Sequence, residues 1–453
     1  MPWFSRSFSR PNHFNPKRVR INSQSCKLTF YRWLHYPASL PMGLPIATSS
    51  LQKIDRWIGV PICGVLSLLR KLLDHRSLGK SAAPGKILFV KFAEQGSTVL
   101  ASAAIRRAIE IVGKGNVYFV VFKENRFILD VMGLVPEENV VTISHHNPVD
   151  MARSALAALL KIRSLNIDSA VDMEFFSRSS AALTYLSGAR RRAGFHTFFG
   201  EGPYRGDLMT HRLLYNPYLH TSQIFRQVVE ALLHDPDQLP TFGTPPPELE
   251  EDLPRFNAPE NETEVVRDIL RSLTGKTDPR IILLNPNASD LLPLRRWETE
   301  RYVELAKRLL ERHPDAFIGM TGAPDETEAI GQVVRAVDST RCFSLAGKTS
   351  MKQLLILYTL CDLLVTNDSG PAHFASLTPI NVITLFGPET PSLFSAQTPR
   401  NVAIWAGIGC SPCVNAYNNR QSACRNNLCM QSITVDQVFA MACKVLEVRS
   451  GVS

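Results

Sequence analysis

The chain has 453 residues, 45% of them hydrophobic, which is enough for two or three folded domains with sizeable cores. This composition excludes a disordered or collagen-like protein. The 50 Lys and Arg exceed the 41 Asp and Glu, and the net charge of +9 would suit a polyanionic partner. Residues 1–80, however, carry a net charge of +11, and the remaining residues sum to −2. We therefore expect no nucleic-acid partner for the body of the protein.

The N-terminal segment is basic and shows neither helical nor strand periodicity. Residues 1–41 are rich in Arg, Ser and Asn, and we expect a disordered segment over residues 1–50. The acid-poor composition also fits an organellar transit peptide, and Met42 offers an alternative start of translation that would remove seven basic charges. The first 30 residues lack the apolar core of a secretory signal, which favours a reducing compartment.

An uncharged run of 13 residues follows, from Trp57 to Leu69. It is too short to span a bilayer as a helix, which takes about 20 residues. Trp57 at one end and basic side chains from Arg70 onward suit a segment that lies in an anionic membrane surface. We predict an amphipathic, membrane-proximal helix over residues 51–80, and a helix packed on the neighbouring domain is the alternative.

From residue 86 the chain alternates short apolar runs with segments of helical period, which is typical of βαβ units and a parallel sheet. A Pro-rich, acidic stretch at 236–262 interrupts this rhythm and predicts a linker between domains at 81–235 and 263–453. The predicted class is α/β with two doubly wound parallel sheets, and ligands of such sheets bind beyond the carboxyl ends of the strands. We expect strands at 86–92, 116–122, 140–143, 168–174, 280–285, 316–321, 363–367 and 381–386, and helices at 99–112, 148–165, 298–312, 325–337, 351–361 and 434–448.

The most informative motif is Asn367-Asp-Ser-Gly-Pro-Ala-His373, where a buried strand ends and a helix begins near Ser369. The free backbone N–H groups of Ser369 and Gly370 would favour an anion such as phosphate, and Gly370 permits close approach. Pro371 suits the first helical turn, and His373 projects from the same face as Ser369. The alternative is an ordinary capped helix with a surface His.

Two further strand ends carry polar side chains. Asn287 follows the first strand after the linker, and Arg295 and Arg296 come next, where their guanidinium groups could grip a diphosphate bidentately. Glu326 follows the next strand and could accept hydrogen bonds from a ribose. The alternatives are solvated arginines and a carboxylate that caps a helix.

These motifs, with Gly96, residues 385–388 and Cys410-Ser-Pro-Cys413, resemble glycosyltransferase family 9, the bacterial heptosyltransferase family, over about residues 86–448. The resemblance implies a GT-B fold of two Rossmann-like domains. The first would bind a lipid-linked glycan acceptor and the second a nucleotide-sugar donor, usually ADP-heptose. It further implies an inverting transfer without a catalytic metal, which builds the lipopolysaccharide core at the inner membrane, so that the protein would be cytoplasmic and peripherally bound there. Carried over by position, the donor-binding residues would be Asn287, Arg295, Arg296, Glu326, Asp368, Ser369, Gly370, Pro371 and His373.

One loop departs from the family pattern. The family's first loop reads Ser-x-Gly-Asp, and its Asp is the expected catalytic base, whereas this chain has Glu94-Gln-Gly-Ser97. Serine cannot deprotonate an alcohol unaided, so we predict that Glu94 is the base and that Ser97 binds substrate or caps the next helix. Because Glu94 and Arg295 lie in different halves, domain closure would bring them together. A different donor, or a catalytically weakened nucleotide-sugar-binding or assembly protein, is the alternative.

Nine cysteines are too sparse for a disulfide scaffold, but four of them cluster near the C-terminus. Cys410, Cys413, Cys424 and Cys429 have a spacing that suits a structural zinc site with four thiolate ligands. Disulfides and free thiols are the alternatives.

Overall fold

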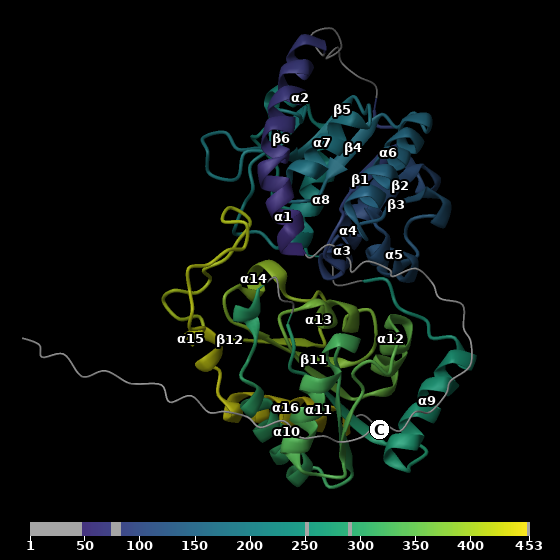
Figure 1. The fold of residues 1–453 in the computed structure, drawn as a ribbon, viewed down its shortest axis with the longest axis vertical. Helices are drawn as coiled ribbons and strands as arrows, with labels where there is room; N and C mark the ends of the chain where they lie inside the picture. Colours follow the sequence, from purple (N-terminus) through teal and green to yellow (C-terminus); the bar gives the residue numbers. More distant parts are fainter. Residues whose placement is uncertain (1–47, 74–82, 250–252, 289–291, 451–453) are drawn as a thin grey trace, which may run out of the picture. The chain divides into compact units, whose positions relative to one another are not determined.

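The computed structural model describes residues 48–73, 83–249, 253–288 and 292–450. The residues 1–47 of the predicted basic segment and residues 74–80 of the predicted membrane-proximal helix lie outside these ranges. The described chain contains two six-stranded sheets in which all neighbouring strands are parallel, each with helices packed against it (Figure 1). The α/β class and the two parallel sheets are therefore confirmed.

The first sheet has the strand order β3-β2-β1-β4-β5-β6. Every residue of the central β1 is buried, as expected for a parallel sheet covered on both faces. The strands are β1 (Ile87–Val90), β2 (Val117–Phe122), β3 (Val140–Ile143), β4 (Ser169–Asp172), β5 (Arg191–Phe195) and β6 (His211–Leu213). The helices are α3 (Gln95–Leu100), α4 (Ser102–Val112), α5 (Arg126–Met132), α6 (Pro148–Ser164), α7 (Arg178–Leu186) and α8 (Thr221–Glu230).

The second sheet has the order β12-β11-β10-β7-β8-β9. Its strands are β7 (Arg280–Asn285), β8 (Ala316–Met320), β9 (Cys342–Ser344), β10 (Leu363–Asn367), β11 (Asn381–Phe386) and β12 (Asn401–Trp405). Its helices are α9 (Glu260–Thr274), α10 (Thr299–Arg312), α11 (Thr327–Val337), α12 (Met351–Leu360), α13 (Gly370–Ala375), α14 (Pro391–Phe394), α15 (Leu428–Gln431) and α16 (Val435–Ser450). The first residues of α9, with Glu260 and Glu262 near its positive end, lie inside the stretch predicted as linker.

Two helices, α1 (Thr48–Trp57) and α2 (Gly59–Leu73), stand where the sequence predicts one helix over residues 51–80. The two helices run end to end, because Ile58 and Ile62 donate backbone hydrogen bonds to the carbonyl oxygens of Ile54 and Ile58 across their junction. This α1–α2 segment packs on the first domain through polar contacts. The Asp55 carboxylate accepts hydrogen bonds from the backbone N–H groups of Arg178 and Ser179 at the start of α7, and Ser67 Oγ accepts one from Asp207 at 2.7 Å. In the described ranges, no helix combines the length and the hydrophobicity needed to cross a membrane.

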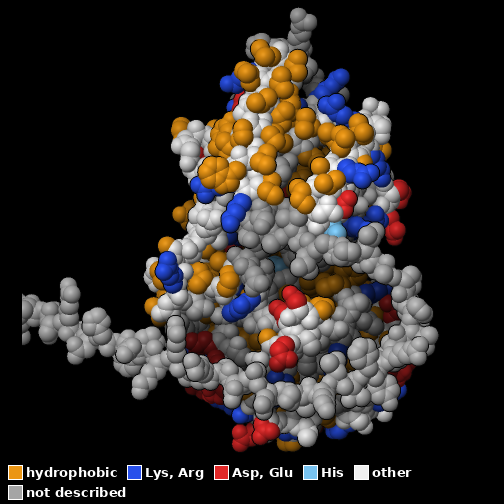
Figure 2. All heavy atoms as spheres, in the orientation of Figure 1, with side chains coloured by type: hydrophobic (Ala, Val, Ile, Leu, Met, Phe, Trp, Pro, Cys, Tyr) orange, Lys and Arg blue, Asp and Glu red, His pale blue; other side chains and the backbone are white. Residues whose placement is uncertain are grey.

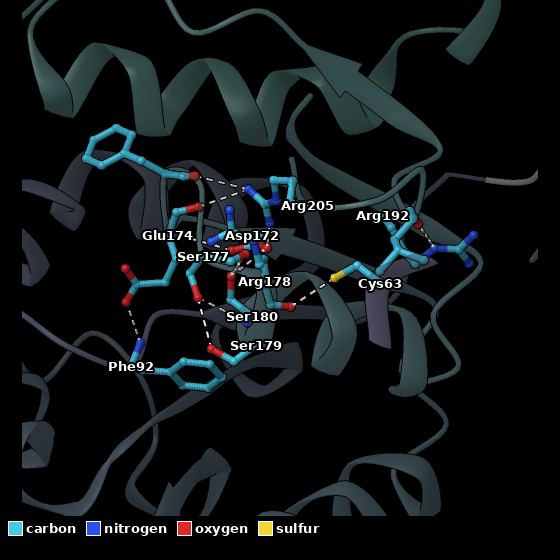
Figure 3. A network of polar contacts seen from close by, with 12 residues as sticks. Cys63, Phe92, Asp172, Glu174, Ser177, Arg178, Ser179, Ser180, Arg192 and Arg205 are labelled. Atoms are coloured by element: carbon cyan, nitrogen blue, oxygen red, sulfur yellow. Dashed lines mark hydrogen bonds and ion pairs between the residues drawn. The ribbon is translucent and has the colours of Figure 1, made fainter. Parts of the chain in front are cut away.

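A buried ion pair ties the loops at the carboxyl end of the first sheet together (Figure 3). Asp172, the last residue of β4, accepts hydrogen bonds from Arg205 and from Ser180 Oγ. Arg205 also donates to the carbonyl oxygens of Glu174 and Phe175. These contacts fix the segment after β4, which in turn supports the loop after β1.

Candidate functional site

The loop after β1 meets the Asn367–His373 segment directly. A Cβ added at Gly96 would lie 2.7 Å from His373 Cδ2 and 3.4 Å from Gly370 Cα, so only glycine fits at this point. Helices α3 and α13, which carry these residues, are neighbours. The structure thus brings the candidate base of the first half to the candidate donor loop of the second, as the sequence argument requires.

The loop that carries Glu94 is held by another carboxylate. Glu174 Oε1 accepts hydrogen bonds from the backbone N–H groups of Phe92 at 2.8 Å and Ala93 at 3.1 Å (Figure 3). Glu94 itself has a φ of 65°, in the left-handed region that costs a non-glycine residue about 1 kcal/mol or more. Ser97 Oγ donates to the Glu94 carbonyl oxygen at 3.0 Å and lies 3.3 Å from its carboxylate. Ser97 therefore orients Glu94, and its role toward a substrate stays a prediction.

The Glu94 carboxylate lies among cations. Arg420 forms an ion pair with Glu94 Oε1, although the two residues belong to different halves of the chain. Burial favours the protonated acid, but Arg420, Lys91 and Arg295 more than offset it and lower the pKa of Glu94 to about 2. Glu94 is therefore ionised at neutral pH and, while Arg420 is in place, only weakly basic.

Asn367 joins the end of β10 to the connection between β7 and α10. Its Oδ1 accepts hydrogen bonds from the Trp297 backbone N–H at 3.1 Å and from the Tyr302 hydroxyl at 3.2 Å. Its Nδ2 donates to the carbonyl oxygens of Pro286 and Asn287 at 3.0 and 3.1 Å. Both polar atoms of this buried amide are used in positioning, so the loops after β7 and β10 form one rigid unit.

Arg295 pairs with two buried carboxylates. Its Nη2 lies 2.7 Å from Glu389 Oε2, its Nε 3.6 Å from Asp368 Oδ2, and its Nη1 donates to the Asp368 carbonyl oxygen. Burial raises the pKa of Asp368 well above its usual range, Arg295 opposes this, and the adjacent Glu389 adds to it. Glu389 is only 2% exposed and also lies 3.6 Å from Arg420 Nε. The sequence argument did not identify either Glu389 or Arg420.

The other candidate donor-binding residues divide into two groups. Arg296 donates twice to the Ala288 carbonyl oxygen, and Glu326 accepts from the Ala323 N–H at 2.7 Å, so both carry local structural contacts. In contrast, the buried Nδ2 of Asn287 has no hydrogen-bond partner within the described part of the chain and lies near Gly322. Asn287 is therefore available to a ligand, whereas ligand contacts of Arg296 and Glu326 stay predictions.

His373 and its neighbours line the junction between the halves. Burial lowers the pKa of His373 to about 3, with His220 and Arg295 acting in the same direction, so the ring is neutral at physiological pH. Its buried Nδ1 has no partner. Ser369 Oγ donates to the Asn367 carbonyl oxygen, and Gly370 and Pro371 open the six-residue helix α13. A neutral His373 can act as a hydrogen-bond donor to a ligand but not as a cation.

The four clustered cysteines line a single cavity of about 470 Å³. All four are free thiols, and Cys429 is buried while Cys410 is exposed. Burial raises the pKa of Cys429, and the neighbouring Cys413 and Cys410 add to this. Across the described ranges, however, no three His, Cys, Asp or Glu side chains stand close enough together to hold a metal ion. The cysteines are thus neighbours around one cavity without forming a ligand set.

Together these side chains make a junction of facing acids and cations. Glu94, Asp368 and Glu389 contribute three carboxyl groups, Arg295 and Arg420 contribute two guanidinium groups, and Lys91 acts on Glu94 as a third cation. Several buried polar atoms here have no hydrogen-bond partner among the described residues: Asp368 Oδ2, Glu389 Oε1, Arg295 Nε and His373 Nδ1. Such an arrangement can accept a proton at Glu94 and neutralise an anion at the arginines.

Comparison with known proteins identifies the family. The profile of "Glycosyltransferase family 9 (heptosyltransferase)" matches residues 158–423, more than half of the chain. The chain belongs to glycosyltransferase family 9. The matched residues include Asn287, Arg295, Asp368 and Arg420, so the whole second-half side of the junction lies inside the family region.

Individual relatives match this family 9 chain over shorter regions. A lipooligosaccharide heptosyltransferase 2 of Campylobacter jejuni (strain 81116) is 27% identical over 168 residues, which is 36% of this chain and 51% of the relative. A lipopolysaccharide heptosyltransferase 2 of Salmonella typhimurium is 34% identical over 102 residues, 22% of this chain and 29% of the relative. The chain thus spans about half the length, or less, of these curated relatives.

Solved structures share the fold over most of the chain. The structure of the E. coli ADP-heptose LPS heptosyltransferase II superposes with a TM-score of 0.61 at 19% identity and covers 81% of this chain and 99% of that one. A family 9 glycosyl transferase from Veillonella parvula gives a TM-score of 0.61 at 16% identity, with 82% and 99% coverage. The predicted GT-B fold of two Rossmann-like domains is confirmed.

Proposed function

We propose that this protein is an inverting glycosyltransferase that moves a heptose, or a related sugar, from a nucleotide-sugar to a lipopolysaccharide core or another lipid-linked glycan. ADP-heptose is the proposed donor, because the relatives are named as heptosyltransferases and one solved relative is named for ADP-heptose. The observation that carries the proposal is the junction where the Glu94 carboxylate of the first half lies beside the arginines and the Asp368–His373 loop of the second.

The proposed reaction is a single displacement. Glu94 accepts the proton of the acceptor hydroxyl as its oxygen forms a bond to the anomeric carbon, and the bond from that carbon to the diphosphate oxygen breaks on the opposite face. Arg295 and the backbone N–H groups of Ser369 and Gly370 would stabilise the charge on the departing diphosphate. Guanidinium groups so placed are the basis for proposing transfer without a catalytic metal. Asn287, Arg296, Glu326, Asp368, Pro371 and His373 complete the proposed donor site.

We propose an anionic membrane surface as the place of reaction. The α1–α2 segment buries its polar side and turns its apolar side outward, and Figure 2 shows hydrophobic side chains gathered over this part of the molecule. Basic Lys53, Arg56 and Lys71 flank the apolar residues, as in segments that lie in a membrane interface. The protein would then be cytoplasmic and peripherally bound to the inner membrane. The exposed apolar residues are Trp57, Ile58, Val60, Ile62, Val65, Leu68, Leu69, Leu72 and Leu73.

A structural zinc remains a proposal for Cys410, Cys413, Cys424 and Cys429. Their common cavity supports it, but the thiols would have to move inward to form a tetrahedral set. Elemental analysis of the purified protein tests it: about one zinc per chain supports the site, and its absence removes it. No step of the proposed transfer depends on this metal.

Binding and turnover separate the proposed function from its alternatives. Calorimetry with ADP measures the nucleotide site, and an assay with ADP-heptose and a lipid-linked acceptor measures transfer. Binding with turnover supports the heptosyltransferase. Binding without transfer to any lipid A or core acceptor would instead support a nucleotide-sugar-binding or assembly protein, and turnover with another nucleotide-sugar would reassign the donor.

A further inference from the structure

Arg420 reaches the junction from a segment without helix or strand, residues 406–427 between β12 and α15. Asn419 and Arg420 both have positive φ angles, 55° and 54°, so the backbone is bent sharply where the side chain enters. Nearby, the Tyr417 ring stacks on Phe176 at 5.7 Å, and its hydroxyl donates to the Tyr215 carbonyl oxygen. The segment therefore belongs to the second half but is anchored on the first.

The guanidinium group of Arg420 is enclosed. It lies 5.0 Å from the ring centre of Phe394 and 6.0 Å from that of Phe175, and the side chain is 21% exposed. Its Nη1 pairs with Glu94 and its Nε faces Glu389 at 3.6 Å. Arg295 binds the other oxygen of Glu389, so a single buried carboxylate holds two guanidinium groups side by side.

The two arginines are engaged by acids in this arrangement. Arg420 faces Glu94 and Glu389, and Arg295 faces Asp368 and Glu389, so a diphosphate would have to compete with these carboxyl groups for the guanidinium groups. Two adjacent guanidinium groups match the two phosphates of a diphosphate, since each can bind phosphate oxygens bidentately. The buried Glu389 Oε1 and Arg295 Nε without hydrogen-bond partners indicate that this contact set is incomplete without a ligand.

We propose that Arg420 binds the diphosphate of the donor, and that Glu94 and this diphosphate compete for its guanidinium group. The proposal rests on the proposed function, because it takes the donor to be a nucleoside diphosphate sugar. Without donor, the ion pair with Arg420 keeps Glu94 a weak base. When the diphosphate draws Arg420 away, the pKa of Glu94 rises and the carboxylate becomes a stronger base, so donor binds before acceptor. Glu389 is the positioning residue that keeps Arg420 beside Arg295.

Calorimetry with ADP and with inorganic pyrophosphate tests this competition. Arg420→Gln should weaken both ligands about 10- to 100-fold, the loss of one charge-assisted contact. Glu94→Gln should instead tighten both several-fold, because Arg420 no longer has an anionic partner to leave. In the Arg420→Gln background, Glu94→Gln should have no effect. The exposed Arg425→Gln, in the same segment, removes the same charge and should leave binding unchanged.

The opposite pattern would overturn the proposal. If Glu94→Gln weakens pyrophosphate as Arg420→Gln does, the pair only joins the two halves, and if Arg420→Gln leaves binding intact, Arg420 is not a ligand. Arg420→Lys keeps the charge and should retain part of the affinity, which separates a lost contact from a misfolded variant. Pyrophosphate binding that follows the predicted pattern in an enzyme that transfers no sugar would refute the proposed function and leave this inference standing.

Discussion

Two buried ion-pair networks of this protein differ in how completely their acids are satisfied. In the first half, Asp172 Oδ1 accepts from the Glu174 N–H, and Oδ2 accepts from Ser180 and Arg205. At the junction, Asp368 Oδ2 and Glu389 Oε1 are also buried, lie 3.6 Å from the Nε atoms of Arg295 and Arg420, and have no hydrogen-bond partner in the described ranges. In the first network only the cation, at Arg205 Nε, keeps an unsatisfied atom, whereas the second leaves carboxyl oxygens unsatisfied, as a site awaiting a ligand does.

The largest expected effect is on turnover, when Glu94 of the junction network is replaced. Glu94→Gln keeps the size of the side chain and removes the base, so the turnover number should fall about 10²- to 10⁴-fold. The donor should still bind, and the melting temperature should change little. Steady-state kinetics with ADP-heptose measures this, with the exposed Glu138→Gln as the control. Unchanged turnover in Glu94→Gln would show that Glu94 is not the base.

At the Asp172 network the expected effect is on stability instead. Arg205→Met leaves the buried carboxylate without its cation and should lower the free energy of unfolding by about 3–5 kcal/mol. Urea unfolding measures it, and Arg267→Met on the exposed face of α9 is the control that should be near neutral. Replacing the pair together, with Asp172→Leu, should recover much of the loss. Equal effects of Arg205→Met and Arg267→Met would contradict this assignment.

This loss should also depend on pH. Burial raises the pKa of Asp172 to about 6 from 3.8, Arg205 opposes this, and removing Arg205 raises the pKa further. A carboxyl group whose pKa is raised in the folded state lowers the free energy of unfolding as pH rises from its unfolded pKa to its folded pKa, and a higher folded pKa extends this interval. The Arg205→Met variant should therefore lose more stability at pH 8 than at pH 5.

A smaller effect is expected in the pH dependence of the reaction. Because Arg420 helps to lower the pKa of Glu94 from 4.5 to about 2, the acid limb of kcat/KM should lie well below pH 4.5. In Arg420→Gln the pKa rises, and the limb should move to higher pH, by about one unit or more. His373, whose pKa lies near 3, should add no limb between pH 5 and 8. An acid limb at the same pH in wild type and Arg420→Gln would show that Arg420 does not control Glu94.

The smallest effect is expected at the surface of the α1–α2 segment. Val65 is 61% exposed on α2, and Val65→Ser should weaken binding to vesicles of anionic phospholipid about tenfold, since it removes one apolar side chain from the interface. The matched control is Val265→Ser on α9, where the valine is 48% exposed. Equal vesicle binding by the two variants would show that the apolar face of the α1–α2 segment does not contact lipid.

The sequence predicts the strands that are apolar runs well and misses those that are short, polar or half-exposed. The strands at 140–143, 280–285, 363–367 and 381–386 are found with the expected bounds, because they are continuous apolar runs bounded by polar residues. Strands β5, β6, β9 and β12 were not predicted. β5 begins with Arg191 and Arg192, β6 and β9 have three residues each, and β12 is half-exposed, so none shows a clear apolar run.

The residues of the candidate site likewise divide into those that the sequence could predict and those that it could not. Glu94, Ser97 and the Asp368–His373 segment follow strand ends, so topology places them at the junction, and the structure brings them together. Glu389 also follows a strand end, that of β11, and the same rule could have identified it. Arg420 could not be found locally, because it lies in a segment without periodicity and reaches Glu94 only through tertiary folding.

The central claim, transfer of a heptose to a lipid-linked glycan, is tested most directly by mass spectrometry of the host's lipopolysaccharide and other glycolipids after deletion of the gene. The account predicts a glycan truncated by one heptose and all sugars beyond it, restored by the wild-type gene but not by the Glu94→Gln variant. Unchanged glycolipids in the deletion strain, from a protein that binds ADP when purified, would contradict it.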